Sequence, residues 1–408
     1  MDIWLINHYA VPPKYYPLAR QTCFARYLMA MGHTVTIFAA STVHNSNMNL
    51  ITDGAPWRDE VVDGVHYVYI RCMDYQGNGL KRIYNICEFA WKLPGVCRKF
   101  PRPDAIVATS MPPTSCAMGI HLARKYGCRG VAEIADLWPE SIVAYGIAGP
   151  RNPAVRALRR LEKWIYEKAD DVVFTCEGGY DYIVEQGWEG RIPRAKIHYI
   201  NNGVDLAVFD ENRARYTVQD PDLEDPSVFK VVYTGSIRKV NHLGLLLDAA
   251  KEVTDPRVKF LIWGDGDQRA ALEQRVREEE ISNVVFKGKV EKKYIPSIVS
   301  RADINLIHGG DQGKELFRFG ISPNKMFDCF AAGRPILMDL PAKYNPVEQF
   351  QAGICLSSVS EIPAAIRQIQ VLSPQAYESL CGNARKAAAR FDFRVLTQEL
   401  MEILEKRG

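Results

Sequence analysis

Short runs of apolar, often β-branched residues recur along the first half of the chain, and longer segments with helical spacing of apolar residues lie between them. The apolar runs are "DIWLI", "TVTIFAA", "HYVYI", "DAIVATS", "GVAEI" and "DVVFTC". Residues 20–31 and 113–126 are examples of the helical segments. Strands that alternate with helices in this way are typical of parallel sheets built from βαβ units.

The alternation starts again in the second half, with the runs "KVVYTGS", "KFLIWGDGD", "NVVFKGK", "DINLIHGG", "RPILMDL" and "GICLSS". Residues 203–228 are polar, acidic and without a sustained period, which is typical of a linker. The pattern predicts an α/β protein with two Rossmann-like domains, over residues 1–205 and 206–385. A helix over residues 386–408 is expected to pack back on the first domain. Ligands of such folds bind outside the carboxyl ends of the strands, so we expect a site in a cleft between the domains.

The amino-acid composition disfavours several kinds of function. The chain has 408 residues, of which 47% are hydrophobic and 24% charged, as in ordinary globular proteins. A net charge of +3 is too small to indicate nucleic-acid binding. The ten cysteines include no C-x-x-C pair, so zinc and thioredoxin-like sites are disfavoured and reduced core thiols are expected.

No targeting or membrane-spanning segment is evident. The opening "MDIWLINHYA" lacks the basic start of a signal peptide. No apolar run reaches the length of about 18 residues that a transmembrane helix needs. We therefore expect a cytoplasmic protein, which would reach a lipid-linked substrate from the inner face of the cytoplasmic membrane.

The segment "FRFGISPNKMFDCFAAGRPIL" over residues 317–337 has the pattern of a loop, a helix and a buried strand. Ser322 is a suitable N-cap, and Pro323 suits the first helical turn. The helix start would offer free N–H groups and positive dipole to a phosphate, and Lys325 adds a full charge there. Asp328 lies on the same face and has two possible roles: binding sugar hydroxyls, or a local pair with Lys325 in a plain capped helix.

Three further stretches contain residues suited to a site. "GDGD" follows a strand, and its glycines Gly264 and Gly266 allow backbone to approach a ligand, although a simple strand-to-helix turn explains them too. "EIADLWPES" places Asp136, Trp138 and Glu140 after a strand, where acids are often functional, although a loop turned by Asp and Pro explains them equally well. In the loop after the first strand, His8 is either a ligand or a satisfied polar residue.

Two segments of the first domain are basic. Residues 80–102 mix Lys and Arg with Tyr84, Phe89 and Trp91, and residues 156–168 form a second basic helix. A solvated surface explains both. The alternative is contact with an anionic membrane or a lipid-diphosphate acceptor. A nucleic-acid partner lacks any supporting motif.

The second half resembles the nucleotide-binding domain of retaining glycosyltransferases of family 4, which have the GT-B fold. The resemblance rests on "INNGVD", "VVYTGS", "FLIWGDGD", "VVFKGKV" and "SPNKMFDCFAAGRPIL", in this order and spacing. The first half resembles the family more loosely, through its opening strand, "MGHTVTIFAAS" and "DLWPES". The pattern of the chain resembles a branch with "PSK" before the acid, which acts in bacterial O-antigen and capsule assembly.

Two departures from the family pattern change the implied site. The first of the family's two glutamates would fall at Gly320, and the usual Arg and Lys would fall at Ser236 and Asn241. The resemblance therefore implies that Lys325 serves the diphosphate, with Arg238 or Lys239 as helper. Asp328 would bind the ribose, and the Val290 backbone would lie near the base.

The implied donor-binding residues are Gly235, Ser236, Arg238, Lys239, Gly264, Gly266, Val290, Ser322, Pro323, Asn324, Lys325 and Asp328. On the acceptor side the resemblance implies His8, Trp138 and Glu140. Asp136 and Lys325 are the implied catalytic residues, with Asp136 near the reacting sugar carbon.

The sequence thus predicts a retaining glycosyltransferase that moves a sugar from a nucleotide-sugar, UDP-linked, to a saccharide acceptor on a lipid diphosphate. The sugar nucleotide is a substrate, no cofactor is expected, and no metal is expected because no D-x-D motif lies at a suitable place. Two alternatives stay open: a UDP-sugar 2-epimerase of the same fold, and an inactive nucleotide-sugar-binding protein. A nicotinamide dehydrogenase is disfavoured because "INHYAVPP" lacks G-x-G-x-x-G.

Overall fold

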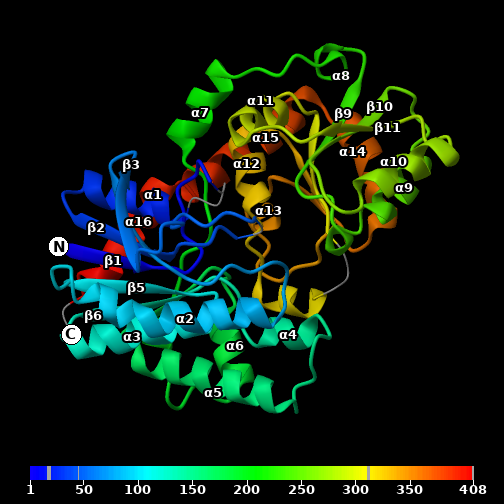
Figure 1. The fold of residues 1–408 in the computed structure, drawn as a ribbon. Helices are drawn as coiled ribbons and strands as arrows, with labels where there is room; N and C mark the ends of the chain where they lie inside the picture. The colour runs from blue at the N-terminus through cyan, green and yellow to red at the C-terminus, as the bar shows by residue number, and fades with distance from the viewer. Residues whose placement is uncertain (16–19, 45, 310–312, 407–408) are drawn as a thin grey trace. The chain divides into compact units, whose positions relative to one another are not determined.

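The computed structural model describes residues 1–15, 20–44, 46–309 and 313–406, and the chain folds as two α/β units (Figure 1). Unit 1 consists of Met1–Asn201 and Phe393–Gly408, and unit 2 of Asn202–Asp392. The last two residues of the predicted final helix, 407–408, lie outside the described residues.

The apolar runs of the first half form the eight-stranded sheet of unit 1, in the order β3-β4-β2-β1-β5-β6-β7-β8. All neighbouring strands are parallel except β3 and β4, which form an antiparallel pair at the edge. The runs lack alternation because helices cover both faces of the inner strands. The strands are β1 Asp2–Ile6, β2 Thr34–Ala40, β3 Trp57–Val62, β4 Val65–Ile70, β5 Ala105–Ser110, β6 Arg129–Ile134, β7 Asp171–Phe174 and β8 Ile197–Tyr199.

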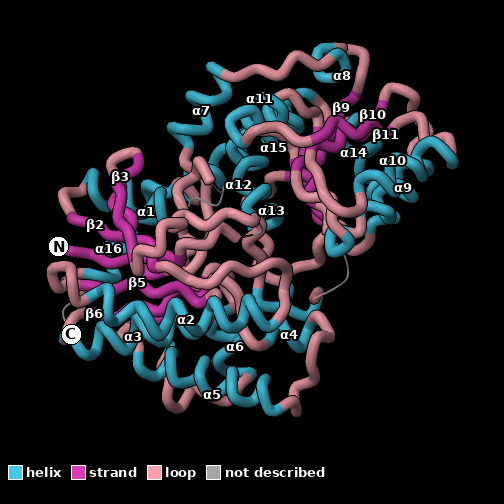
Figure 2. Tube along the Cα trace, viewed as in Figure 1, coloured by secondary structure: helices cyan, strands magenta, loops and turns pink. Residues whose placement is uncertain are grey.

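Helices cover both faces of this sheet (Figure 2). α3 packs on β5 and β6 with α2 and α5 beside it, whereas α1 packs on β2 and contacts α16. The Phe24 and Phe393 rings meet edge to face across α1 and α16, with centroids 5.6 Å apart. The helices are α1 Arg20–Ala30, α2 Leu80–Cys97, α3 Pro113–Tyr126, α4 Glu140–Ala144, α5 Pro153–Lys168, α6 Gly179–Glu185, η1 Arg194–Lys196 and α16 Phe393–Leu404.

The second series of apolar runs forms the six-stranded parallel sheet of unit 2, in the order β11-β10-β9-β12-β13-β14. α9 neighbours both α10 and α14, and α12 packs between α11 and α15. The strands are β9 Phe229–Thr234, β10 Val258–Trp263, β11 Val284–Gly288, β12 Ile304–Ile307, β13 Ile336–Met338 and β14 Gly353–Cys355. The α-helices are α7 Leu206–Arg215, α8 Pro221–Glu224, α9 Leu243–Lys251, α10 Arg269–Glu278, α11 Ile295–Ser300, α12 Asn324–Ala332, α13 Pro346–Gln349, α14 Ile362–Gln370 and α15 Pro374–Arg390. The 3₁₀ turns are η2 Lys239–Asn241, η3 Lys292–Tyr294, η4 Lys314–Phe319 and η5 Val359–Glu361.

The predicted linker over residues 203–228 is wrong in its local structure, because it contains α7 and α8. Asp205 caps α7 by accepting a hydrogen bond from the Val208 N–H at 3.1 Å, and Asp220 caps α8 in the same way. Phe209 is the buried residue of α7. A helix with so little apolar surface has no periodic pattern to detect, so only its caps could have predicted it.

The boundaries between the units also differ from the predicted ones at 205 and 386. α15 packs along α12 and ends at Arg390, so the chain stays in unit 2 until Asp392. Aromatic rings reinforce this packing, since Phe391 lies 5.3 Å from Phe327 between ring centroids. The start of α12 is therefore held firmly within unit 2.

No helix among the described residues has both the length and the apolar character needed to cross a bilayer.

Candidate functional site

The loops that follow β9, β10 and β11 lie against one another at the carboxyl edge of the unit 2 sheet. The Gly235 N–H donates to the Trp263 carbonyl at 3.0 Å, and the Gly264 N–H donates to the Gly288 carbonyl at 2.9 Å. The Ile237 N–H donates to the Asp265 carbonyl at 2.9 Å. These backbone bonds make the three loops a single rigid surface.

Gly264 and Gly266 are required by this contact between loops. A Cβ atom on Gly264 would lie 1.8 Å from the Gly235 carbonyl oxygen, and one on Gly266 would lie 2.2 Å from the Ile237 carbonyl oxygen. Neither distance is possible for real atoms, so both positions need glycine whether or not a ligand is bound. The ligand approach expected from the sequence is therefore not needed to explain these two glycines.

Substituting Gly264→Ala should lower the thermal stability of the chain by several degrees and weaken nucleotide binding. The added methyl group must push two backbone segments apart, at a cost of about 1–3 kcal/mol for overpacking. Differential scanning calorimetry with and without UDP measures both effects.

Gly382→Ala is the matched control for that substitution. Gly382 lies in α15 and has no atom within 4 Å of its would-be Cβ. Replacing a helical glycine by alanine should stabilise the chain by about 0.5–1 kcal/mol. If Gly264→Ala melts like this control, the close approach of the two loops is wrong.

Lys325 of α12 reaches this loop surface. Its Nζ atom donates a hydrogen bond to the Tyr233 hydroxyl at 2.9 Å and lies 4.1 Å from the centroid of the same ring. The Tyr233 hydroxyl in turn donates to the Ser236 carbonyl at 3.1 Å. A Cβ on Gly235 would lie 3.1 Å from Nζ, so the ammonium group sits directly beside the turn after β9.

The start of α12 corrects the predicted cap. The helix begins at Asn324, Pro323 occupies the N-cap position, and no side chain caps the first turn. The Ser322 hydroxyl oxygen accepts instead from the Asn202 N–H at 3.2 Å, and the Ser322 carbonyl accepts from Asn202 Nδ2 at 3.1 Å. Ser322 therefore fixes the first residues of unit 2, and the N–H groups of the first helical turn keep no side-chain partner.

The local Lys325–Asp328 pair is also wrong. Asp328 is buried and forms an ion pair through Oδ2 with Lys292 of η3. Lys325 turns instead toward Tyr233. The two residues share a helix face, but each finds a partner on a different neighbouring element, which spacing along one helix cannot reveal.

The structure shows how the chain is arranged at the positions that depart from the family pattern. The Ser236 hydroxyl donates to Asn241 Oδ1 at 2.9 Å, so a neutral hydrogen bond replaces the two expected cations. Gly320 has a φ of 101°, a backbone conformation that disfavours glutamate. Arg238 and Lys239 are exposed, and neither forms an ion pair within the part of the chain that the structure describes. Lys325 is therefore a cation that reaches the turn at Gly235 from α12 rather than from the loop itself.

Val290 follows β11 and is partly buried. It packs against an apolar cluster that includes Trp263 and Leu261. Its backbone lies just beyond the carboxyl end of β11, and its side chain is used for packing.

In unit 1, Asp136 and Glu140 have different surroundings. The Asp136 side chain reaches solvent, yet the protein around it reduces its hydration enough to raise the pKa of its carboxyl group. Glu140 begins α4 and accepts from Arg159 Nη2 of α5 at 2.5 Å, so its carboxylate is engaged in an ion pair. Trp138, between them, is partly buried. Asp136 is the more accessible of the two acids.

His8 is fully buried, which disfavours a role as a ligand on the acceptor surface. Its Nε2 atom lies 2.8 Å from Asn85 Oδ1, while Nδ1 has no hydrogen-bond partner among the described residues. Burial lowers the pKa of His8 to about 3, so the ring is neutral at physiological pH. The edge-to-face contact with Phe89 shows how deeply the ring is packed.

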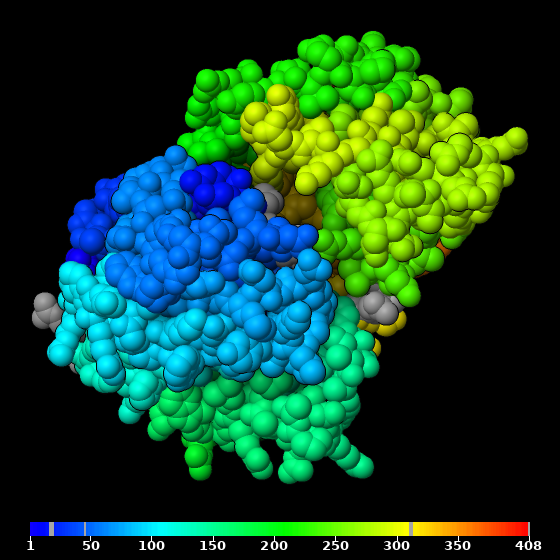
Figure 3. Space-filling view, viewed as in Figure 1, coloured from blue at the N-terminus to red at the C-terminus, as the bar shows by residue number. Residues whose placement is uncertain are grey.

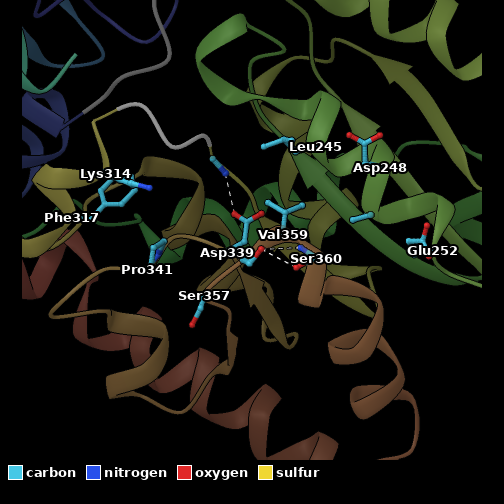
Figure 4. A pocket seen from close by; sticks show the side chains of 13 residues that line it. Leu245, Asp248, Glu252, Lys314, Phe317, Asp339, Pro341, Ser357, Val359 and Ser360 are labelled. Carbon is cyan, nitrogen blue, oxygen red and sulfur yellow. Dashed lines mark hydrogen bonds between the residues drawn. The ribbon is translucent and has the colours of Figure 1, made fainter. Parts of the chain in front are cut away.

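Reasoning from the sequence missed a buried pair in unit 2 and the pocket beside it, which is shown in Figure 4. His308 Nδ1 contacts the Asp339 carboxylate, and the Gly309 N–H donates to the other oxygen of Asp339 at 3.1 Å. These residues end β12 and β13, next to a pocket of about 480 Å³ whose opposite sides carry Lys314 and Glu252. The signal was available, because "LIHGG" and "LMDL" each place a polar residue after a buried strand.

No group of three or more His, Cys, Asp or Glu side chains suited to a metal ion occurs in residues 1–15, 20–44, 46–309 and 313–406.

Two parallel-sheet α/β units with loops and a helix start at the carboxyl edge of the second sheet define a GT-B fold, which is the fold of a large class of glycosyltransferases. Residues 21–203 match the family described as "Glycosyl transferase 4-like domain", and residues 228–369 match "Glycosyl transferases group 1". The chain belongs to these glycosyltransferase families and is a transferase enzyme.

Two curated relatives are bacterial proteins named for glycosyl transfer. A protein named as colanic acid biosynthesis glycosyl transferase WcaI, from Escherichia coli, is 23% identical over 369 residues, which cover 85% of this chain and 86% of the relative. A protein named as glycosyltransferase WbjE, from Pseudomonas aeruginosa, is 24% identical over 263 residues, covering 64% of this chain and 62% of the relative.

Solved structures share the fold over the whole chain. Sucrose-phosphate synthase from Thermosynechococcus elongatus has a TM-score of 0.70 at 18% identity and covers 98% of both chains. Anabaena HepE in complex with UDP and glucose has a TM-score of 0.66 at 15% identity and covers 100% of both chains. At these identities the likeness supports the fold alone, and it confirms the GT-B architecture predicted from the sequence.

Proposed function

We propose that this glycosyltransferase moves a sugar from a UDP-sugar, with retention at the anomeric carbon, to a saccharide carried on a lipid diphosphate. The reaction would serve the assembly of a bacterial surface polysaccharide such as O-antigen or capsule, at the inner face of the cytoplasmic membrane. Support comes from the relatives, whose names include colanic acid and teichuronic acid biosynthesis. Structural neighbours crystallised with UDP, UDP-glucose or UDP-2-fluoro glucose support the choice of nucleotide.

The observation that carries the proposal is the position of Lys325. Its ammonium group is fixed by Tyr233 beside the Gly235 turn, one residue into a helix whose first N–H groups have no side-chain cap. Departure of a nucleoside diphosphate leaves negative charge on the phosphates, and preorganised cations and N–H groups aimed at that charge stabilise the transition state. Lys325 and the start of α12 would supply this without a metal or another cofactor.

The remaining roles are those that the resemblance to the family implies. Asp328 would accept hydrogen bonds from the ribose hydroxyls, and the backbone at Val290 would contact the base. Arg238 and Lys239 are exposed cations in the loop after β9, and they would help bind the diphosphate. On unit 1, Asp136 would lie near the reacting sugar carbon, where its raised pKa would let it hold a proton at higher pH than an ordinary aspartate.

A panel of UDP- and GDP-sugars tests the donor first, because a ligand that binds only the folded chain raises its melting temperature. The stabilising donor is then incubated with membrane-extracted lipid-diphosphate saccharides in the presence of EDTA, and the anomeric configuration of the product is read by NMR. Stabilisation by a UDP-sugar and transfer with retention in EDTA would support every part of the proposal.

Other results would contradict the proposed function or a part of it. Interconversion of the UDP-sugar without acceptor would indicate a 2-epimerase. Binding without transfer to any acceptor would indicate a protein that has lost catalysis. Stabilisation by GDP-sugars alone, an inverted product, or transfer abolished by EDTA would each overturn the corresponding part.

A further inference from the structure

α2 carries a row of apolar side chains that faces solvent. Leu80 is 83% exposed, Tyr84 57% and Trp91 78%, and Ile83 beside them is 56% exposed. Residues 80, 84, 87 and 91 follow one another at spacings of four, three and four, so their side chains lie on one face of the helix. We call Leu80, Ile83, Tyr84, Cys87 and Trp91 the α2 stripe.

The opposite face of α2 already fulfils the structural role of the helix. Asn85, Phe89, Leu93 and Val96 are buried against unit 1. The α2 stripe is therefore not needed for the core. An exposed row of large apolar side chains on one helix usually marks a surface that meets another apolar phase.

Exposed cations border the α2 stripe. Lys81 lies next to Leu80 in the chain, and Arg98 and Lys99 follow the end of the helix. Lys81 and Arg98 form no ion pair among the described residues. Lys92 differs, because it pairs with Glu88 at 2.7 Å. The charges bordering the stripe are thus positive and available.

The second basic helix, α5, has the charge but lacks the apolar row. Arg156 and Arg160 are exposed, and no large apolar side chain of α5 is exposed. The apolar positions of α5, such as Val155 and Ile165, are buried instead. Of the two basic segments seen in the sequence, α2 is therefore the one that combines exposed apolar, aromatic and cationic side chains. Residues 80–97 form part of the molecular surface shown in Figure 3.

We infer that the α2 stripe docks on an anionic lipid bilayer. Leucine and isoleucine would enter the acyl boundary, and the Trp91 and Tyr84 rings would take the headgroup level that such side chains prefer. Lys81, Arg98 and Lys99 would contact anionic headgroups. The helix would lie in the plane of the surface, since no helix among the described residues combines the length and the apolar character needed to cross a bilayer.

Charge favours a bilayer over a second copy of the chain. A symmetric dimer brings the same surface of both copies together, so Lys81 and Arg98 would face their own counterparts or each other. Like charges at an interface oppose association. An anionic bilayer presents the complementary charge along the whole helix.

The inference deepens the proposed function, because it names the surface by which the chain would reach a lipid-linked acceptor. Vesicle binding is measured without donor or acceptor, so its failure and the failure of the transferase proposal are separate results.

Vesicle flotation of the full chain tests the inference. Vesicles of phosphatidylcholine with about 30 mol% phosphatidylglycerol should bind the protein at about 0.15 M salt, and pure phosphatidylcholine should bind it at least tenfold more weakly. The double variant Leu80→Ser/Trp91→Ser should lose at least about tenfold in partition coefficient, as should Lys81→Gln/Arg98→Gln. All six substituted positions in these and the control variant are exposed, so the fold should be unaffected.

Arg156→Gln/Arg160→Gln on α5 is the matched control, because it removes the same charge from the helix without an apolar row. It should bind vesicles within about twofold of the unsubstituted chain. Cys87 provides a second readout, since it is the exposed one of the ten cysteines. An environment-sensitive fluorophore on Cys87 should brighten on anionic vesicles.

Equal vesicle binding by the α2 and α5 variants would overturn the inference. A stable dimer that the Leu80→Ser/Trp91→Ser variant dissociates, with no vesicle binding by the unsubstituted chain, would assign the stripe to self-association instead.

Discussion

Replacing Lys325 by methionine is expected to lower kcat/KM for sugar transfer about a hundredfold or more, with the chain still folded. Methionine keeps the unbranched apolar stem and removes the charge. The ammonium group interacts with the diphosphate most strongly when the bond from the sugar carbon to the diphosphate breaks, because the phosphate charge is then greatest. The loss should therefore appear mainly in kcat, with a smaller change in KM. Steady-state kinetics with the donor identified by the stability panel measures both.

The fold of the Lys325→Met variant can be checked independently. Its partner in the free protein is the Tyr233 hydroxyl, which keeps its own bond to the Ser236 carbonyl, so no buried charge is left alone. The melting temperature should change little. Lys239→Met, at an exposed lysine, should reduce turnover modestly if Lys239 helps bind the diphosphate. Lys293→Met is the control: this lysine is partly buried and pairs with Glu291 at 3.0 Å, and its loss should leave turnover unchanged. Unchanged turnover in Lys325→Met would remove this residue from the diphosphate site.

Much of the fold was predictable because its strands are buried on both faces. Runs such as "TVTIFAA" and "KFLIWG" must lie in a covered sheet, and their alternation with helical segments leaves few topologies. α7 and α8 escaped prediction because short helices held by aspartate caps have almost no apolar periodicity. The predicted end of unit 2 at 385 fell inside α15, since the point where a chain crosses between units is set by tertiary packing.

The candidate site was predictable in its residue types and less so in its contacts. Lys325 could be selected from a proline, a lysine and an acid at a helix start. Its contact with Tyr233 joins residues that are 92 positions apart in the chain. That contact depends on which strand neighbours α12, and sequence spacing does not give this information. The same limit applies to Asp328, whose partner Lys292 comes from η3. The His308–Asp339 pair is a different case, because both residues end adjacent strands.

The residues that depart from the family pattern are explained by contacts that they or their neighbours form. Ser236 and Asn241 bond to each other, so the loop after β9 keeps its shape without the two usual cations. Lys325 then places one cation beside that loop from α12. Gly320 adopts a backbone conformation that a glutamate would strain. The chain thus has a locally rebuilt site rather than a family site with residues deleted, and for this reason restoring a single family residue should not increase activity.

Asp328→Asn is expected to weaken UDP binding about tenfold to a hundredfold, because a carboxylate that accepts two ribose hydroxyls makes charge-assisted hydrogen bonds that an amide cannot match. In the free protein the contact with Lys292 uses Oδ2, and Oδ1 has no hydrogen-bond partner among the described residues. The contact with Lys292 orients the buried carboxylate and leaves its other oxygen for a ligand. Isothermal titration calorimetry measures the affinity.

The ribose assignment itself is separated from general electrostatics by a second ligand. The unsubstituted chain should bind UDP about tenfold or more tightly than 2′,3′-dideoxy-UDP, and Asp328→Asn should bind both with nearly the same, weaker affinity. Asp225→Asn removes an exposed carboxylate elsewhere in unit 2 and should preserve the full discrimination. A variant that loses affinity equally for both nucleotides would show that Asp328 acts only by holding Lys292 in place. Discrimination that survives in Asp328→Asn would place the ribose hydroxyls against another residue, and the donor would then have to lie differently across the loops after β9, β10 and β11.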